Sequence, residues 1–173
     1  MRGREAEAMG ISFNVKKSVD GKASPLTFAF MQHAPGFLRL VNEAKTRVKE
    51  ITVEQARDRL SRNPKAVLMD VREDHEWQAG HAAEAVHLGK GIFERDLEKT
   101  VPDPATEIIL YCGGGFRSAL TADAAQQMGY RNVFSLIGGY KGMVAANWPM
   151  KKGSLNPARA THARNEALKF ARG

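Results

Sequence analysis

The sequence predicts an α/β fold in which helices cover both faces of a central, mainly parallel sheet. Three short apolar runs of strand length lie at residues 66–71, 107–111 and 132–137. Stretches with helical features separate them, and a strand, a helix and a strand in that order require a crossover that makes the strands parallel. The 173 residues are enough for one domain that buries its own core.

Two helices are expected within the middle of the chain. The sequence T-V-E-Q at residues 52–55 fits a capping box, in which the threonine hydroxyl and the glutamine side chain each satisfy a free backbone amide. This helix should run to about Leu60. The second helix should lie between the last two strands, where small apolar residues recur from Ala119 to Met128 and Gly129 ends it.

Changes in composition divide the chain into three parts. We expect residues 1–49 to form an N-terminal extension with a helix near residues 36–48, where apolar side chains recur at helical spacing after Pro35. Residues 50–150 should form the main domain. Residues 151–173 should form a basic C-terminal extension, with a short helix near its end.

The charge and the cysteine count restrict the function further. The net charge of +7 comes from the two extensions, whereas residues 50–150 contain more acidic than basic side chains. Loose basic ends are more often solubilising tails than binding sites, and no aromatic-interleaved basic motif is present, so nucleic acid is not an expected partner. No apolar stretch is suited to spanning a membrane. One cysteine cannot form an internal disulfide, and we expect a cytoplasmic protein.

That cysteine, Cys112, stands where a buried strand ends and a helix is about to begin. Gly113, Gly114 and Gly115 remove every side chain after it, so the backbone can curl tightly and turn its N–H groups inward. A helix starting near Ser118 would add its free amides and the positive end of its dipole. The stretch therefore predicts an anion cradle that stabilises a thiolate, with Cys112 as the nucleophile.

Charged and polar residues around the loop have expected supporting roles. Arg117 can either pair with a carboxylate at the loop rim or hold an anionic substrate in a bidentate way. Ser118 is expected to cap the following helix and could touch the sulfur. Asp70 and Arg72 follow a strand and should form an ion-pair scaffold near the loop, together with Glu76. The histidines have no spacing that predicts a metal site.

Three ordered motifs resemble the rhodanese-like sulfurtransferases. The C-x-x-G-x-R-S of residues 112–118 resembles the family's active loop. The D-V-R-E-x-x-E-W-x-x-G-H of residues 70–81 is similar to its early segment, and L-I-G-G at residues 136–139, followed by W-P at 148–149, to its closing segment. Three motifs in order are much more specific than the loop alone, and they cover residues 50–150.

The resemblance implies a rhodanese-like fold and a sulfurtransferase activity. The cysteine would take a sulfane sulfur from a small anionic donor such as thiosulfate, or from a persulfidated thiol, and become a persulfide. It would then pass that sulfur to a thiophilic acceptor such as cyanide, a thiol or a protein. No metal or organic cofactor is implied.

Two departures from the family pattern change these expectations. The segment A-A-E-A at residues 82–85 replaces the family's frequent Ile-Pro-Gly-Ala, which changes the turn chemistry there. Many thiosulfate-using members carry a basic residue inside the loop, whereas here Gly113, Gly114 and Phe116 are neutral and Arg117 is the only cation. The open loop could therefore admit a larger donor, such as a persulfidated protein or a low-molecular-weight persulfide.

Two other functions stay open at this point. Dual-specificity phosphatases of the cell cycle resemble this fold but place five residues between cysteine and arginine, whereas this chain has four. The tighter ring suits a sulfur atom better than the phosphate or arsenate of a phosphatase or arsenate reductase. Alternatively, the protein is a non-enzymatic sulfur carrier or interaction module, in which a Cys112 persulfide goes to a dedicated protein and the basic extensions serve as docking arms.

Overall fold

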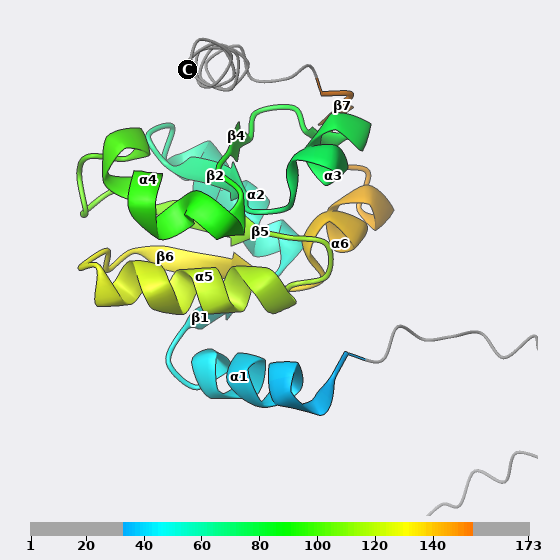
Figure 1. Ribbon diagram of the computed structural model, residues 1–173. Helices are drawn as coiled ribbons and strands as arrows, with labels where there is room; N and C mark the ends of the chain where they lie inside the picture. Colours follow the sequence, from blue (N-terminus) through cyan, green and yellow to red (C-terminus); the bar gives the residue numbers. More distant parts are fainter. Residues whose placement is uncertain (1–32, 154–173) are drawn as a thin grey trace, which may run out of the picture. The chain divides into compact units, whose positions relative to one another are not determined.

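A computed structural model describes residues 33–153 of the chain. Most of the predicted N-terminal extension and nearly all of the predicted C-terminal extension, with its short helix, lie outside the described residues. Within them, strands and helices alternate around a parallel sheet, which confirms the predicted α/β class (Figure 1).

Five parallel strands form the central sheet in the order β1-β6-β5-β2-β4. In chain order they are β1 (Lys49–Ile51), β2 (Val67–Asp70), β4 (Val86–His87), β5 (Ile108–Tyr111) and β6 (Val133–Leu136). β5 is central, and all four of its residues are buried. Because the strands are parallel, their carboxyl ends meet at one edge, which is where ligands bind in open α/β sheets. Cys112 follows β5 at this edge.

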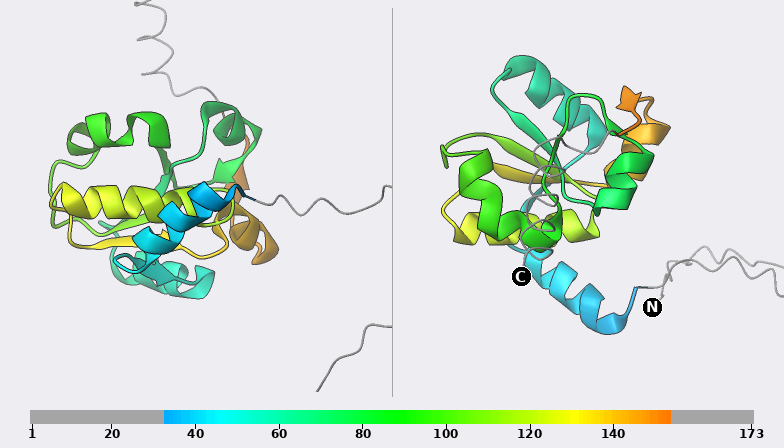
Figure 2. Two further views of the ribbon diagram at one scale, coloured as in Figure 1. Left: turned by 60° about the horizontal axis from the view of Figure 1, so that its bottom comes forward. Right: turned by 45° about the horizontal axis from the view of Figure 1, so that its top comes forward.

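Helices cover both faces of the sheet (Figures 1 and 2). Their bounds are α1 (Pro35–Lys45), α2 (Val53–Arg62), α3 (Asp74–Ala79), the 3₁₀ turn η1 (Lys90–Ile92), α4 (Phe93–Thr100), α5 (Phe116–Gln127) and α6 (Gly139–Ala145). α4 and α5 pack with one apolar cluster, and α2 and α6 pack with another. α1 packs beside α5. The predicted two-faced arrangement is therefore present.

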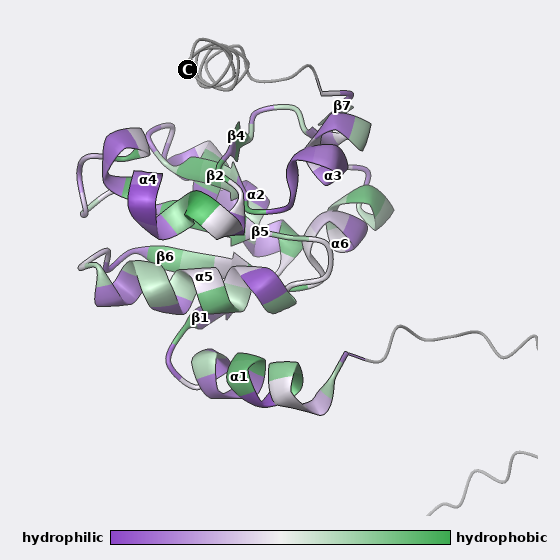
Figure 3. Cartoon of the chain, in the orientation of Figure 1, coloured by the Kyte–Doolittle hydropathy of each residue, from purple (hydrophilic) through white to green (hydrophobic). Residues whose placement is uncertain are grey.

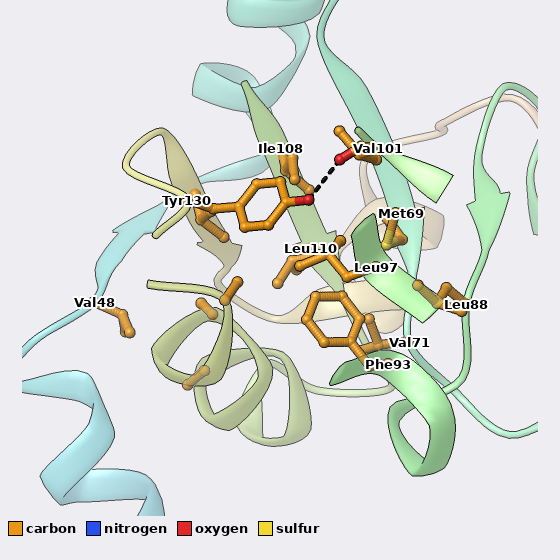
Figure 4. Close-up of a cluster of buried hydrophobic side chains, with 14 of the residues drawn as sticks. Val48, Met69, Val71, Leu88, Phe93, Leu97, Val101, Ile108, Leu110 and Tyr130 are labelled. Atoms are coloured by element: carbon orange, nitrogen blue, oxygen red, sulfur yellow. Dashed lines mark hydrogen bonds between the residues drawn. The ribbon is translucent and has the colours of Figure 1, made fainter. Parts of the chain in front are cut away.

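The two apolar clusters follow from the alternation of side chains along the buried strands. In β5, Ile108 and Leu110 join the cluster with α4 and α5, whereas Ile109 and Tyr111 join the cluster with α2 and α6. In the first cluster, Tyr130 satisfies its buried hydroxyl by donating a hydrogen bond of 2.5 Å to the Val101 carbonyl (Figure 4). Polar residues gather on the outward surfaces of the helices (Figure 3).

The predicted capping box begins α2, as expected. Thr52 is the N-cap, its hydroxyl accepts the Gln55 amide, and the Gln55 side chain accepts the Thr52 amide at 2.9 Å. The helix ends at Arg62 with Asn63 as its C-cap, two residues later than predicted.

None of the helices within residues 33–153 combines the length and apolar character needed to cross a membrane.

Several short elements were not predicted from the sequence. These are α3, η1, α4 and α6, the edge strands β1 and β4, and a separate antiparallel pair of β3 (His81–Ala82) and β7 (Met150–Lys151). The pair joins the segment after α3 to the segment after α6. It includes Ala82 of the A-A-E-A departure, whose amide donates a hydrogen bond to the Tyr111 hydroxyl at 3.1 Å.

Candidate active site

The connection between β5 and α5 forms a tight loop around the sulfur of Cys112. Cys112 is 1% exposed, and the Gly115 amide donates a hydrogen bond to its Sγ at 3.2 Å. Gly115 has a φ of +93°, a left-handed conformation that a side chain makes costly. This glycine turns the chain into α5 and, in the same step, points an amide at the sulfur.

The helix after the loop begins two residues earlier than predicted. Gly115 is its N-cap and Phe116 its first residue, so the prediction that Ser118 caps the helix is wrong. The left-handed glycine completes the turn before the serine is reached. The Ser118 hydroxyl lies buried in the first turn of α5 and shares a hydrogen bond of 2.9 Å with the Ser135 hydroxyl of β6. Ser118 therefore fixes the helix to the sheet.

A second glycine turn packs against the Cys112 loop. At the end of β6, Gly138 and Gly139 have φ values of +74° and +50°, and Gly138 is the N-cap of α6. A Cβ atom on Gly139 would lie 2.2 Å from the Cys112 carbonyl oxygen, so only glycine fits there. The Tyr140 amide donates to the Cys112 carbonyl at 2.7 Å.

The same helix end also binds the next carbonyl of the loop. The Lys141 amide donates to the Gly113 carbonyl at 3.2 Å. In a planar trans peptide the carbonyl and the following N–H point in opposite directions, and the described chain contains no cis peptide bond. The amides of Gly113 and Gly114 are therefore directed away from α6. Gly138 and Gly139 belong to the closing motif, but nothing in that motif predicted a contact with the Cys112 loop.

The charged side of the site is an ion pair between α5 and α3. The Arg117 guanidinium donates to both carboxylate oxygens of Glu76, at 2.6 and 2.9 Å, and the Glu73 carboxylate lies 3.7 Å away. Of the two roles predicted for Arg117, the pairing with a rim carboxylate is the one present in this structure. Hydrogen bonding to Arg117 lowers the pKa of Glu76, so the pair is intact at neutral pH and is lost as the pH falls through that lowered value.

The predicted scaffold of Asp70 and Arg72 is present and buried. The Arg72 side chain donates to Asp70 at 2.6 and 3.0 Å and to the Gly80 carbonyl at 2.6 Å. Its guanidinium carbon lies 4.1 Å from the centre of the Tyr140 ring. Arg72 thus joins the end of β2 to α3 and α6. Glu76, predicted as a further member of this scaffold, pairs with Arg117 instead.

An aromatic cluster flanks the loop on the side of α1. The Phe116 ring lies 4.5 Å from the His33 ring and 6.4 Å from the Phe37 ring, between centroids, and the Lys45 ammonium lies 5.6 Å from its centre. Helical spacing placed Phe37 on the apolar side of its helix, but nothing in that pattern indicated contact with the loop. α1 therefore contributes to the surroundings of the site.

Trp77, His81 and Trp148 are buried and pack within the fold, as expected. His81 is buried, stacks on Trp77 with 3.3 Å between ring centroids, and contacts the Trp77 carbonyl through Nδ1 at 3.1 Å. The buried Trp148 donates to Glu84 at 2.7 Å.

Among residues 33–153, no three His, Cys, Asp or Glu side chains are grouped so that they could hold a metal ion.

Comparison with known sequences identifies the family to which this loop belongs. A sequence profile of the rhodanese-like domain matches residues 52–146, more than half of the chain. The chain belongs to the rhodanese-like domain family. The matched segment contains the Cys112 loop, the Asp70–Arg72 scaffold and the second glycine turn.

Relatives of known name or structure agree with this rhodanese-like assignment. The thiosulfate sulfurtransferase GlpE of Haemophilus influenzae is 34% identical over 102 residues, which cover 59% of this chain and 93% of that protein. The polysulfide-sulfur transferase homodimer of Wolinella succinogenes is similar in structure, with a TM-score of 0.60, 25% identity, and coverage of 70% of this chain and 90% of that one.

A third similar structure carries a different functional description. It is a protein of unknown function from Rhodopseudomonas palustris described as a possible tyrosine phosphatase. The TM-score is 0.59 and the identity 26%, with coverage of 69% of this chain and 98% of that chain.

Proposed function

We propose that this rhodanese-like protein is a sulfurtransferase in which Cys112 carries a sulfane sulfur as a persulfide. The observation that carries the proposal is the Gly115 amide, which donates to the buried Cys112 sulfur at the carboxyl end of the central strand. An amide in this position stabilises negative charge on the sulfur. The GlpE relative, which is named a thiosulfate sulfurtransferase, supports the same chemistry.

The proposed reaction has two transfers of one sulfur atom. The Cys112 thiolate attacks the outer sulfur of the donor, a new S–S bond forms to Sγ, and the donor's own S–S bond breaks. With thiosulfate, the bonding electrons leave on sulfite, and the cysteine becomes an anionic persulfide. An acceptor thiolate or cyanide then attacks the outer sulfur and the electron pair returns to Cys112. No net oxidation of the protein occurs.

The loop can serve both forms of the cysteine. Negative charge moves from Sγ to the outer sulfur when the persulfide forms. We propose that backbone N–H groups directed away from α6 stabilise the charge on this outer sulfur. The amides of Gly113 and Gly114 have this direction because α6 binds the two preceding carbonyls. Since Cys112 must be a free thiol to accept sulfur, we also propose a reducing compartment such as the cytoplasm.

The candidate partners follow from this chemistry. We propose that the donor is a small anionic sulfur compound or a persulfidated thiol. The proposed acceptor is a thiol, either of a small molecule or of another protein, and cyanide replaces it in an assay. A dedicated protein acceptor would make the protein a carrier, in which case turnover with cyanide would be slow even though Cys112 loads with sulfur.

A phosphatase activity is the second candidate because of the Rhodopseudomonas palustris neighbour. The structure gives a reason against it. A phosphate would need the arginine that follows the loop, but both terminal nitrogens of Arg117 donate to Glu76. Robust hydrolysis of an aryl phosphate that Cys112→Ser abolishes would favour this candidate over sulfur transfer.

The proposal is tested by intact-mass measurement after incubation with a sulfane donor. We expect the wild-type protein to gain the mass of one sulfur, dithiothreitol to remove it, and Cys112→Ala to gain none. Cyanide should also remove the sulfur and form thiocyanate. A wild-type protein that gains no sulfur from thiosulfate, a thiosulfonate or a low-molecular-weight persulfide would overturn the proposal.

A further inference from the structure

Arg117, the cation at the end of the cysteine loop, is already paired with carboxylates. Arg117 donates two hydrogen bonds to Glu76, and Glu73 lies 3.7 Å from the same guanidinium. Two carboxylates therefore face one positive charge. The side chains of Glu76 and Arg117 are 25% and 28% exposed, so this pair is partly shielded from solvent, whereas Glu73 is 54% exposed.

The geometry of α3 fixes this pair in place. Glu73 is the N-cap of the helix, and Glu76 completes a capping box by accepting the Glu73 amide at 3.2 Å. One carboxylate thus binds both the start of α3 and the start of α5. Arg117 cannot turn to another anion without breaking two charge-assisted hydrogen bonds.

The pair lies directly against the loop that holds the sulfur. A Cβ atom on Gly113 would lie 3.3 Å from Nη2 of Arg117 and 3.8 Å from Oε1 of Glu76. A donor that approaches Cys112 on this side therefore meets the ion pair and the charge of Glu73. It does not meet an isolated guanidinium.

The second arginine of the site does not supply the missing positive charge. Arg72 is 4% exposed and pairs with the fully buried Asp70. Around this side of the loop both guanidinium groups are balanced by a carboxylate, and Glu73 adds a further negative charge. A doubly charged donor is disfavoured by such a rim about twice as strongly, in free energy, as a singly charged one.

We infer that Glu76 is a specificity-determining residue that disfavours dianionic sulfur donors by holding Arg117. The site then favours donors of lower charge, such as a thiosulfonate monoanion or the persulfide of a thiol. This inference rests on the proposed sulfurtransferase function. It names the class of donor that the same loop accepts best.

The test compares two donors that differ chiefly in charge. Thiosulfate is a dianion, and in the methanethiosulfonate anion a methyl group replaces one of its charged oxygens. The measured quantity is the second-order rate constant for loading Cys112 with sulfur, followed by intact mass. Glu76→Gln keeps the shape of the side chain and an oxygen that can accept the Glu73 amide, but removes its charge.

We expect Glu76→Gln to change the two rate constants unequally. For a donor charge taken to lie about 7 Å away in a surrounding close to water, loss of one negative charge should raise the rate about threefold with a monoanion and about sevenfold with a dianion. The difference between the donors should shrink at high ionic strength, because salt screens the partly exposed charges. Glu73→Gln removes a negative charge that lies 3.7 Å from the Arg117 guanidinium, but it leaves the charge of Glu76 in place, so it should shift both rates in the same direction by less.

A matched control removes an ion pair at the other end of β5, the strand that Cys112 follows. Glu107, just before β5, accepts from Arg59 at 2.8 Å, and its side chain is 16% exposed. Glu107→Gln makes the same change of charge away from the loop and should leave the ratio of the two rates unchanged. Adding Arg117→Gln to Glu76→Gln should remove the preferential gain with thiosulfate.

The outcomes separate this inference from the function on which it rests. A twofold or larger rise in the ratio of thiosulfate to methanethiosulfonate loading in Glu76→Gln, absent in Glu107→Gln, supports it. An unchanged ratio in Glu76→Gln and Glu73→Gln overturns the inference and leaves the proposed function intact. A wild-type protein that loads from neither donor, nor from a persulfide, overturns both.

Discussion

Two neighbouring strands of the sheet end in the same way and serve different purposes. After β5, Cys112 and three glycines lead into α5, with the left-handed Gly115 as N-cap. After β6, Ile137 and two glycines lead into α6, with the left-handed Gly138 as N-cap. The first turn directs an amide at a sulfur, whereas the amides of the second bind carbonyls of the first.

The difference shows where the order of the sulfur loop comes from. A run of three glycines is conformationally free and has no preferred direction for its amides. The second turn removes that freedom, because the amides of Tyr140 and Lys141 bind the carbonyls of Cys112 and Gly113. The chemistry of the loop thus depends on a helix that binds the loop through backbone amides.

The strongest way to break this arrangement is Gly139→Ala. The new Cβ would lie 2.2 Å from the Cys112 carbonyl oxygen, so the two turns must separate, and the residue also keeps a φ of +50°. We expect a loss of about 3 to 5 kcal/mol in the free energy of unfolding, measured by chemical denaturation. A loss below about 1 kcal/mol would show that the two turns are not tightly packed.

Gly115→Ala should have the next largest effect. Its φ of +93° disfavours a side chain, and the new Cβ would lie 3.1 Å from the Leu136 carbonyl oxygen and 3.3 Å from the Gly138 nitrogen. We expect about 2 to 3 kcal/mol of destabilisation by the same measurement. Because the amide of this residue binds Sγ, the loading of Cys112 should slow as well; a variant that is destabilised but loads at the wild-type rate would contradict the role given to this amide.

Gly138→Ala should have the smallest effect of the three and serves as the control for Gly139→Ala. It has a left-handed φ of +74°, but its new Cβ would meet only Gly142, at 3.4 Å from the Cα atom. We expect about 1 kcal/mol of destabilisation from backbone strain alone. An effect as large as that of Gly139→Ala would mean that strain in the turn, and not contact with the loop, decides stability.

Sequence patterns predicted the parts of this comparison that are local. The apolar runs located β2, β5 and β6 to within a residue at each end, because four buried residues in succession are a strong signal. The glycines after Cys112 predicted an inward amide, and the structure places the Gly115 amide on the sulfur. The start of α5 was missed by two residues, since a left-handed glycine can be an N-cap without any capping side chain.

The contacts between distant segments could not be predicted in the same way. α3 and α6 have six and seven residues, too few to show a helical period. Arg117 and Glu76 are separated by 41 positions, and a sequence gives Arg117 no preference among several nearby carboxylates. The approach of Gly139 to the Cys112 carbonyl depends on the register of β5 and β6, which is fixed only when the whole sheet forms.

The most direct test of this account is the rate of sulfur loading in Gly139→Ala and Gly138→Ala, measured by intact mass at a temperature where circular dichroism shows both variants folded. The account predicts that Gly138→Ala loads Cys112 at nearly the wild-type rate, whereas Gly139→Ala loads at least tenfold more slowly, since about 1.4 kcal/mol of lost amide stabilisation corresponds to that factor. Equal loading rates in the two folded variants would contradict the claim that the second glycine turn orients the sulfur loop.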